Sequence, residues 1–218
     1  MRENEASVVI DRRALYSLDK RQRAALVNSL PGFKPVVLVG TVNADSLTNL
    51  CVINSCFHVG ADPALIGMII RPAPQGTERH TLENILATKT YSFNAVTRAM
   101  AQRAHHTSAR FSRDRSEFDA CGFTKQWHED FAAPFVSESP LQLGLKLAEH
   151  LPITINDTHL IIGSIEQIHV CDQSQRDDGT LDLQSMDIVA GVGLDSYHAV
   201  IKGQRFTYAK PDKPPELI

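Results

Sequence analysis

The residues best suited to chemistry in this sequence are small polar and cationic side chains at the ends of predicted strands and at the start of a predicted helix. They are Thr41, Asn49, Asn54, Ser55, Arg71, Arg79, His80, Thr81 and Asn94. A polar group inside a core costs free energy unless it is hydrogen-bonded, so polar residues that interrupt buried strands indicate a bound ligand. A helix that begins with arginine, histidine and threonine combines free backbone N–H groups, a hydroxyl and positive charge, which favours a phosphate.

Each of these residues also has an ordinary structural explanation. Thr81 alone is typical of a helix N-cap, whereas Arg71 and Arg79 alone are typical of solvated surface charge. Asparagines such as Asn49 and Asn54 are common in turns. The functional interpretation therefore depends on the joint placement of the whole set around one group of strands.

The elements that must position these residues follow from apolar patterns and turn signals. Strands are predicted at 36–42, 50–59, 64–70, 91–96, 152–157 and 159–170. Helices are predicted at 19–30, at 79–88 with Thr81 as its N-cap, and at 140–151 with Pro140 in the first helical position, and one or two polar helices between 97 and 121. Consecutive strands joined by tight polar turns make an antiparallel meander, so we expect a mainly β barrel or sandwich with peripheral helices.

Length and composition are those of one globular domain over residues 1–218, with a core from about 31 to 211 and a peripheral N-terminal helix and C-terminal tail. The net charge of −3 predicts no general attraction to nucleic acid or to an anionic membrane. The charge is uneven, because the stretch from Arg71 to Lys125 holds nine Lys and Arg against five Asp and Glu. A local cationic region on an acidic protein favours a small anionic ligand over a polyanion.

The four cysteines predict a reducing compartment. Cys51, Cys56, Cys121 and Cys171 have no CxxC spacing, and two of them lie inside apolar strand patterns, so we expect buried free thiols. The N-terminus has no apolar signal core, and no stretch is long and apolar enough to span a membrane. A cytoplasmic location is the resulting expectation.

The common catalytic motifs do not occur, since GxGxxG, Walker, HExxH and GxSxG patterns are all missing from the sequence. His105 and His106 are neighbours on a predicted helix and would not face one metal site, so no metal is predicted. Cys121 fits a structural thiol better than a nucleophile. We therefore assign residues that position a ligand and no catalytic side chain.

A series of short segments resembles the flavin reductase-like, FMN-binding split-barrel family. The segments are NLCVINS (49–55), HVGADP (58–63), RP (71–72), RHTLENI (79–85), FN (93–94), HTSA (106–109), SEFDACG (116–122), APFVSESP (133–140), HLIIGSI (159–165), LDSYH (194–198) and YAKP (208–211). Their order and spacing carry the likeness over nearly the whole chain. The resemblance implies a six-stranded antiparallel Greek-key split barrel, a homodimer, and FMN held near the dimer interface.

The resemblance also implies roles for individual residues. Asn49, Asn54 and Ser55 match the family segment that faces the isoalloxazine ring and ribityl chain. Arg79, His80 and Thr81 match the helix start that meets the phosphate, and Arg71 lies where it could add charge. The polar interruptions of the strands are then ligands of the flavin.

Three functions remain open at this stage. The first is an enzyme, either an NAD(P)H-dependent FMN reductase or a flavoredoxin-like protein that passes electrons to a partner protein. The second is a non-catalytic FMN-binding module, and the third is a dimeric interaction protein that has lost the flavin. The polar segment 104–118 is expected to be a mobile cover over the flavin, with a surface excursion of no functional role as the alternative.

Overall fold

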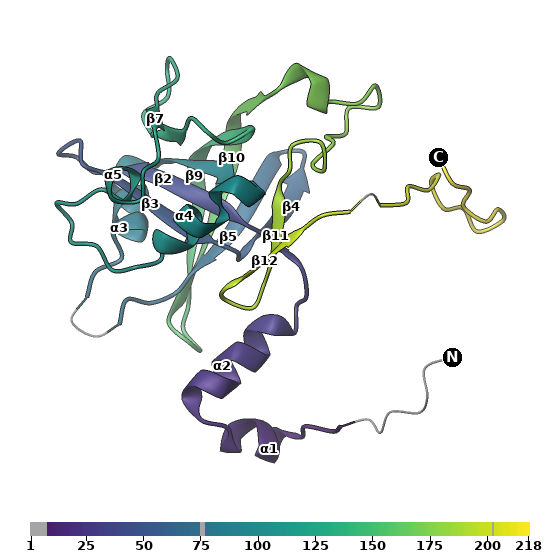
Figure 1. Cartoon of the computed structure of the whole chain (residues 1–218), viewed down its shortest axis with the longest axis horizontal. Coiled ribbons are helices and arrows are strands. Elements are labelled where there is room, and N and C mark those ends of the chain that lie inside the picture. The colour runs from purple at the N-terminus through teal and green to yellow at the C-terminus, as the bar shows by residue number, and fades with distance from the viewer. Residues whose placement is uncertain (1–7, 75–76, 202) are drawn as a thin grey trace.

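The computed structural model describes residues 8–74, 77–201 and 203–218 and is built around one seven-stranded antiparallel sheet (Figure 1). The strand order is β3-β2-β6-β9-β10-β5-β4. Its strands are β2 (Val37–Val42), β3 (Thr48–Ile53), β4 (Cys56–Ala61), β5 (Ala64–Ile70), β6 (Thr90–Ala95), β9 (Leu141–Ile153) and β10 (Thr158–Val170). The mainly β fold with peripheral helices is therefore confirmed.

The sheet curls because its two edge strands are neighbours in the sequence. β3 and β4 lie at opposite ends of the strand order, yet only Asn54 and Ser55 separate them along the chain. The backbone N–H of Ile69 in β5 donates to the carbonyl of Ser55 over 3.1 Å, which ties this link to the far end of the sheet. The predicted strand 50–59 is thus two strands, and this break gives seven strands where six were expected.

The predicted helix at 140–151 is wrong, because the chain there forms β9, which pairs with β6 on one side and β10 on the other. Leucines at 141, 143, 145 and 147 repeat every second residue, which is the period of a strand. The predicted strand 152–157 also shortens, since β9 ends at Ile153 and a turn follows before β10. The two strands form one long hairpin.

Two large apolar clusters lie on either side of β2, and a small third cluster holds Phe131, Ala133 and Phe135. One large cluster contains Leu38, Leu50, Val96 and Phe118 and packs the barrel wall against the segment after β6. The other large cluster contains Val39, Met68, Ile85, Tyr91, Phe93, Leu145 and Ile161, and it fills the barrel interior beneath a helix. Burying this apolar area supplies the main favourable term for folding.

Helices and two small sheets surround the barrel. The helices are α1 (Arg12–Ser17), α2 (Lys20–Ser29), α3 (His80–Thr88), α4 (Ala101–His106) and α5 (Glu117–Ala120), with 3-10 turns η1 (Arg98–Met100) and η2 (Asp172–Ser174). The small sheets are β1-β11-β12, from Lys34–Pro35, Val189–Val192 and Ser196–Ala199, and β7-β8, from Lys125–Gln126 and Phe135–Val136. Within the described ranges, the helices are all too short to cross a membrane.

All four cysteines are free. Cys56 and Cys121 are buried and Cys51 is partly buried, whereas Cys171, which directly follows β10, is exposed. The prediction of buried thiols is therefore wrong for Cys171, whose apolar neighbours end at the strand terminus.

Candidate functional site

One cleft of about 800 Å³ brings together segments that are far apart in the sequence. Its walls come from β3 and the link to β4 (49–55), the end of β5 (69–71), the start of α3 (77–81), the segment 105–113 and the hairpin β11–β12 (191–197). Ligand pockets usually measure about 300–1,000 Å³, so this cleft has room for a ligand of dinucleotide or flavin size.

The cleft unites seven of the nine predicted site residues. Those that line it are Asn49, Asn54, Ser55, Arg71, Arg79, His80 and Thr81. Thr41 and Asn94 do not line it, and both are completely buried. Most of the predicted residues therefore lie together at one cleft, as the functional interpretation requires.

The cationic end of the cleft is the start of α3. Arg79 is the N-cap residue and makes no side-chain capping bond, so the predicted capping role of Thr81 is wrong. The Arg79 guanidinium donates from Nε and Nη2 to the carbonyl of Pro72 over 3.3 and 3.1 Å, which holds it across the approach to the helix. His80 pairs through Nε2 with a Glu78 carboxylate oxygen at 3.2 Å. The backbone N–H of Arg79 donates to the Glu83 carboxylate over 3.1 Å. The next N–H groups of a first helical turn have no intrahelical partners, so they can bind an anion.

A buried polar network fixes the start of α3 against the barrel. The Asn49 amide donates to the hydroxyls of Thr41 and Thr81 over 3.2 and 3.0 Å. Asn84 donates to the same Thr41 hydroxyl over 3.1 Å. Thr41 is thus a hub that links β2, β3 and α3, and its contribution to the site is to hold Asn49 and Thr81 in place.

Asn94 has a purely structural set of bonds. Its amide nitrogen donates to the carbonyl of Leu38 over 3.0 Å and to the hydroxyl of Ser92 over 2.9 Å. Its amide oxygen accepts from the backbone N–H of Val136 over 2.9 Å. These bonds satisfy the side chain inside the core and tie β8 to the barrel.

The opposite end of the cleft is built around the link between β3 and β4. Asn54 donates from its amide to the carbonyl of Gly193 over 2.8 Å, which couples the barrel to the β11–β12 hairpin. Ser55 donates from its hydroxyl to the carbonyl of Ile69 over 2.7 Å. Arg71 donates to the amide oxygen of Asn28 in α2 over 2.6 Å.

The segment 104–118 forms one wall of the cleft and is joined to the β3 edge. The Thr107 hydroxyl accepts from the backbone N–H of Val52 over 2.9 Å, and the Glu117 carboxylate accepts from that of Leu50 over 2.9 Å. Arg113 donates from Nε and Nη2 to Glu78 over 3.0 and 2.9 Å and also pairs with Glu83. The segment therefore bridges the outer edge of the barrel and the start of α3.

Two titratable groups at the cleft floor are shifted by burial. Burial raises the pKa of the Cys51 thiol to about 11, and the nearby Glu117 carboxylate adds to this effect. Burial also raises the pKa of Glu117, against the opposing effect of the Leu50 N–H bond. Cys51 is therefore a thiol at neutral pH, which makes it a poor nucleophile.

Sequence reasoning placed the segment 104–118 over the ligand but missed the second outer wall, the β11–β12 hairpin. His105 Nδ1 and the Tyr197 hydroxyl lie 3.1 Å apart, joining α4 to β12 across the cleft. Ser108 and Arg110 line the same wall. The polar run from His105 to Phe118 was a visible signal, whereas the hairpin at 189–199 is too short for its pattern to predict that it returns to the barrel.

Comparison with known proteins now identifies the class. Residues 33–185 match the model of the "Flavin reductase like domain" family, so the chain belongs to that family. A candidate flavin reductase with a split barrel domain from Shewanella frigidimarina NCIMB 400 is similar in structure, with a TM-score of 0.89 and 43% identity over 93% of this chain and 100% of that one. The family prediction and the split-barrel fold are therefore confirmed.

More distant solved structures share the fold. Flavoredoxin of Desulfovibrio vulgaris (Miyazaki F) is 25% identical, with a TM-score of 0.67 over 83% of this chain and 91% of that one. Nitrilotriacetate monooxygenase component B from Bacillus cereus is 17% identical, with a TM-score of 0.80 over 91% of this chain and 98% of that one.

Proposed function

We propose that this protein is an FMN-binding oxidoreductase that uses NAD(P)H, acting as a flavin reductase or as a flavoredoxin-like electron-transfer protein. The observation that carries the proposal is the cleft, which joins a cationic helix start at one end to an amide- and hydroxyl-lined strand link at the other. Membership of the flavin reductase-like family supports the same chemistry.

The residues present fit FMN. Arg79 and the first turn of α3 are suited to a phosphate dianion, since Arg donates charge-assisted hydrogen bonds and the helix N-terminus adds N–H donors. Asn54 and Ser55 lie at the link between β3 and β4, where the polar edge of a ring system would need donors and acceptors, and Asn49 lies beside the start of α3 through its bond to Thr81. FMN supplies the two-electron redox chemistry when bound, and the protein supplies binding, orientation and exclusion of water.

No side chain of the cleft is assigned as an acid or a base. The Cys51 thiol has a pKa of about 11, so it holds its proton at neutral pH. Arg79, His80 and Thr81 would hold the phosphate, and Thr41 would position Thr81 through Asn49. The segment 104–118 would cover the bound flavin, held shut by the Arg113 ion pairs with Glu78 and Glu83.

We also propose a homodimer in the cytoplasm. The edge strand β4 exposes Phe57 and Val59, and an exposed apolar edge needs a cover. The cytoplasm is proposed because the four cysteines stay unpaired.

The deciding experiment is a pair of assays on the purified protein. Titration with FMN, FAD and riboflavin should show preference for FMN, and steady-state oxidation of NADH and NADPH should depend on added flavin. FMN binding without any NAD(P)H oxidation would indicate a non-catalytic FMN-binding module. Absence of flavin binding would refute the proposal.

A further inference from the structure

The segment from Val8 to Phe33, here called the N-terminal arm, contains two helices that bury none of their residues. Figure 1 shows the arm running away from the barrel, with α1 farther out than α2. The arm meets the barrel near its C-terminal end, where the amide oxygen of Asn28 accepts from Arg71 Nη2 over 2.6 Å. Residues 33–185 match the family model, so almost the whole arm precedes the family domain.

The arm nevertheless has ordered helices with side-chain caps and internal contacts. The Asp11 carboxylate caps α1 by accepting from Ala14 N over 2.7 Å, and Asp19 caps α2 by accepting from Arg21 N over 2.8 Å. The guanidinium groups of Arg12 and Arg23 both lie over the Tyr16 ring, 5.6 and 5.5 Å from its centroid, and fix the angle between the helices. Helices of 6 and 10 residues are not stable alone in water, so this structure requires a surface to pack on.

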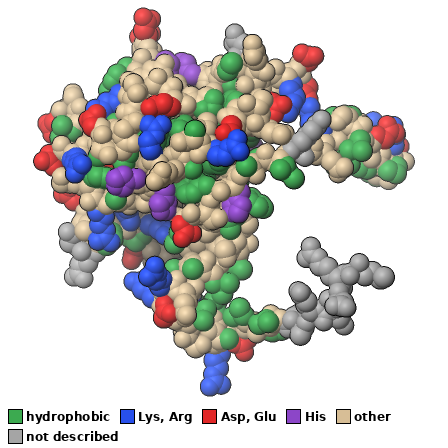
Figure 2. Space-filling model, viewed as in Figure 1, with side chains coloured by type: hydrophobic (Ala, Val, Ile, Leu, Met, Phe, Trp, Pro, Cys, Tyr) green, Lys and Arg blue, Asp and Glu red, His purple; other side chains and the backbone are tan. Residues whose placement is uncertain are grey.

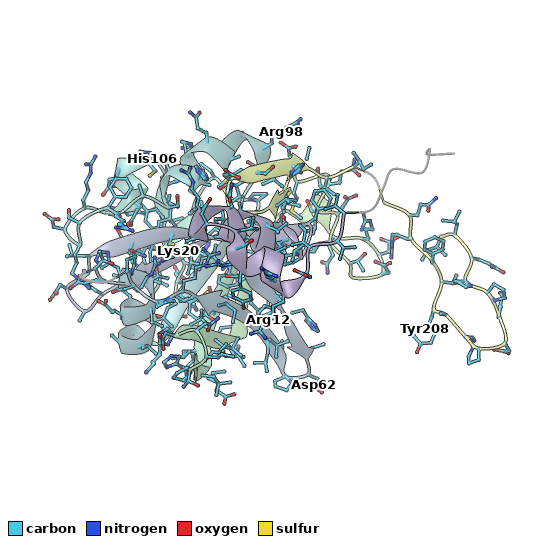
Figure 3. The ribbon with its side chains drawn as sticks, turned by 90° about the horizontal axis from the view of Figure 1, so that it is seen from below. Arg12, Lys20, Asp62, Arg98, His106 and Tyr208 are labelled. Carbon is cyan, nitrogen blue, oxygen red and sulfur yellow. The ribbon has the colours of Figure 1, made fainter. Side chains whose placement is uncertain are left out.

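The apolar side chains that would meet such a surface point into solvent. On the arm, Val9 is 83% exposed, Leu30 70% and Phe33 69%. The C-terminal tail (200–218) has the same character, with Ile201 84% and Tyr208 89% exposed. Figure 3 shows Tyr208 far out on this tail, and Figure 2 shows the arm and the tail projecting on either side of an open hollow.

The solvent-accessible surface area of the chain indicates how much surface a partner could bury. The chain exposes 14233 Å², whereas a compact monomer of 24.1 kDa exposes about 10,000 Å² by the usual scaling with mass. The excess is roughly 4,000 Å², and an obligate dimer buries about 1,000–2,500 Å² on each partner. A second copy of the chain therefore has enough surface to cover the arm and the tail.

Charge indicates where the arm would lie on that copy. From Asp11 to Ser29 the arm carries five Lys and Arg against two Asp. The segment from Asp172 to Asp195, which includes β11, carries six Asp against one Arg. Asp178, Asp182 and Asp187 pair with arginines of the same chain, and Asp177 and Asp195 are exposed. Opposite charge on two surfaces favours their association and sets its orientation.

We infer that the N-terminal arm and C-terminal tail of each chain clasp a second copy, with the arm against the acidic segment 172–195 of that copy. The inference rests on the proposed homodimer and adds the elements that form it. Because each copy places its arm on the other copy, the resulting dimer has twofold symmetry.

Sedimentation of full-length variants tests the inference. Tyr16→Asp and Leu30→Asp place a charge on the arm, and Ile155→Asp, at the tip of the β9–β10 hairpin and 91% exposed, is the matched control. The wild type and Ile155→Asp should sediment as dimers at micromolar concentration. Each arm variant should weaken the dimer by roughly a hundredfold or more, because symmetry places the substitution in the interface twice. An unchanged near-ultraviolet circular dichroism spectrum of the barrel would show that each variant remains folded.

The outcomes separate the inference from the proposed function. A monomeric wild type would overturn both the homodimer and the clasp. A wild-type dimer that survives both arm substitutions would overturn the clasp alone and place the interface elsewhere. Arg21→Glu should weaken the dimer more at low salt than at high salt, because salt screens the attraction. The same weakening at both salt concentrations would show that the arm does not lie against the acidic segment 172–195.

Discussion

Replacing Arg79 with alanine should weaken FMN binding and leave riboflavin binding nearly unchanged. Riboflavin lacks the phosphate that this guanidinium is placed to meet, so the substitution removes a donor that one ligand uses and the other does not. Arg79 is the N-cap of α3 but makes no side-chain capping bond, so its removal costs the helix little.

The size of the effect follows from the bonds exchanged. A hydrogen bond to a charged group contributes about 1.5–3 kcal/mol, and part of this gain is offset because the guanidinium gives up its bond to the Pro72 carbonyl when it contacts the phosphate. The guanidinium is partly exposed, and solvent screening places the net value at the low end. A net loss of about 1.4 kcal/mol corresponds to a roughly tenfold rise in the Kd for FMN.

Fluorescence titration of FMN and riboflavin against the wild type and the variant measures both affinities. Arg98→Ala is the matched control, since this arginine pairs with Asp187 outside the cleft. An equal loss for both ligands would mean that the substitution damaged the fold. No loss for either ligand would refute the placement of the phosphate at Arg79.

Three further predictions concern the supports of the site. Thr41→Val removes the acceptor shared by Asn49 and a second buried amide, so the free energy of unfolding in urea should fall by about 1–3 kcal/mol and FMN affinity should fall with it. Burial raises the folded-state pKa of Glu117 above its ordinary 4.5, so the protein loses stability as the pH rises from 4.5 through the folded-state pKa. Glu117→Gln should reduce this loss, and an unaltered dependence of unfolding free energy on pH would contradict the prediction. Arg113→Ala removes the pairing with Glu78, so stopped-flow FMN release should be faster, while release at the wild-type rate would show that the segment is not a cover.

The sequence indicated which residues gather at one cleft better than it indicated the elements around them. Strands such as 64–70 and the helix at 79–88 have one dominant period and were confirmed. The stretch 140–151 was misjudged because Pro140 and the run Ala148-Glu149-His150 favour a helix, while the leucine alternation before them favours a strand. The stretch forms a strand because it pairs with β6 and β10. Local propensity contains no information about those distant partners.

The site residues divide in the same way. Seven lie on the cleft because strand ends and a helix start are local features that a sequence displays. Thr41 and Asn94 could not be told from ligand-binding residues, since a buried polar side chain looks the same in sequence whether its partner is a ligand or the protein. The N-cap of α3 was placed two residues late, because threonine is the better capping residue and the structure uses that hydroxyl to accept from Asn49 instead.

The order in which the chain folds follows from the link at Asn54 and Ser55. The pairs β2–β3, β4–β5 and β9–β10 are hairpins between consecutive strands, and such local contacts form early. The link lies between two of these hairpins, so the barrel closes there only after distant strands have paired. We therefore expect the cleft to form after the transition state for folding, so that a ligand seated on this link slows unfolding and leaves the folding rate unchanged.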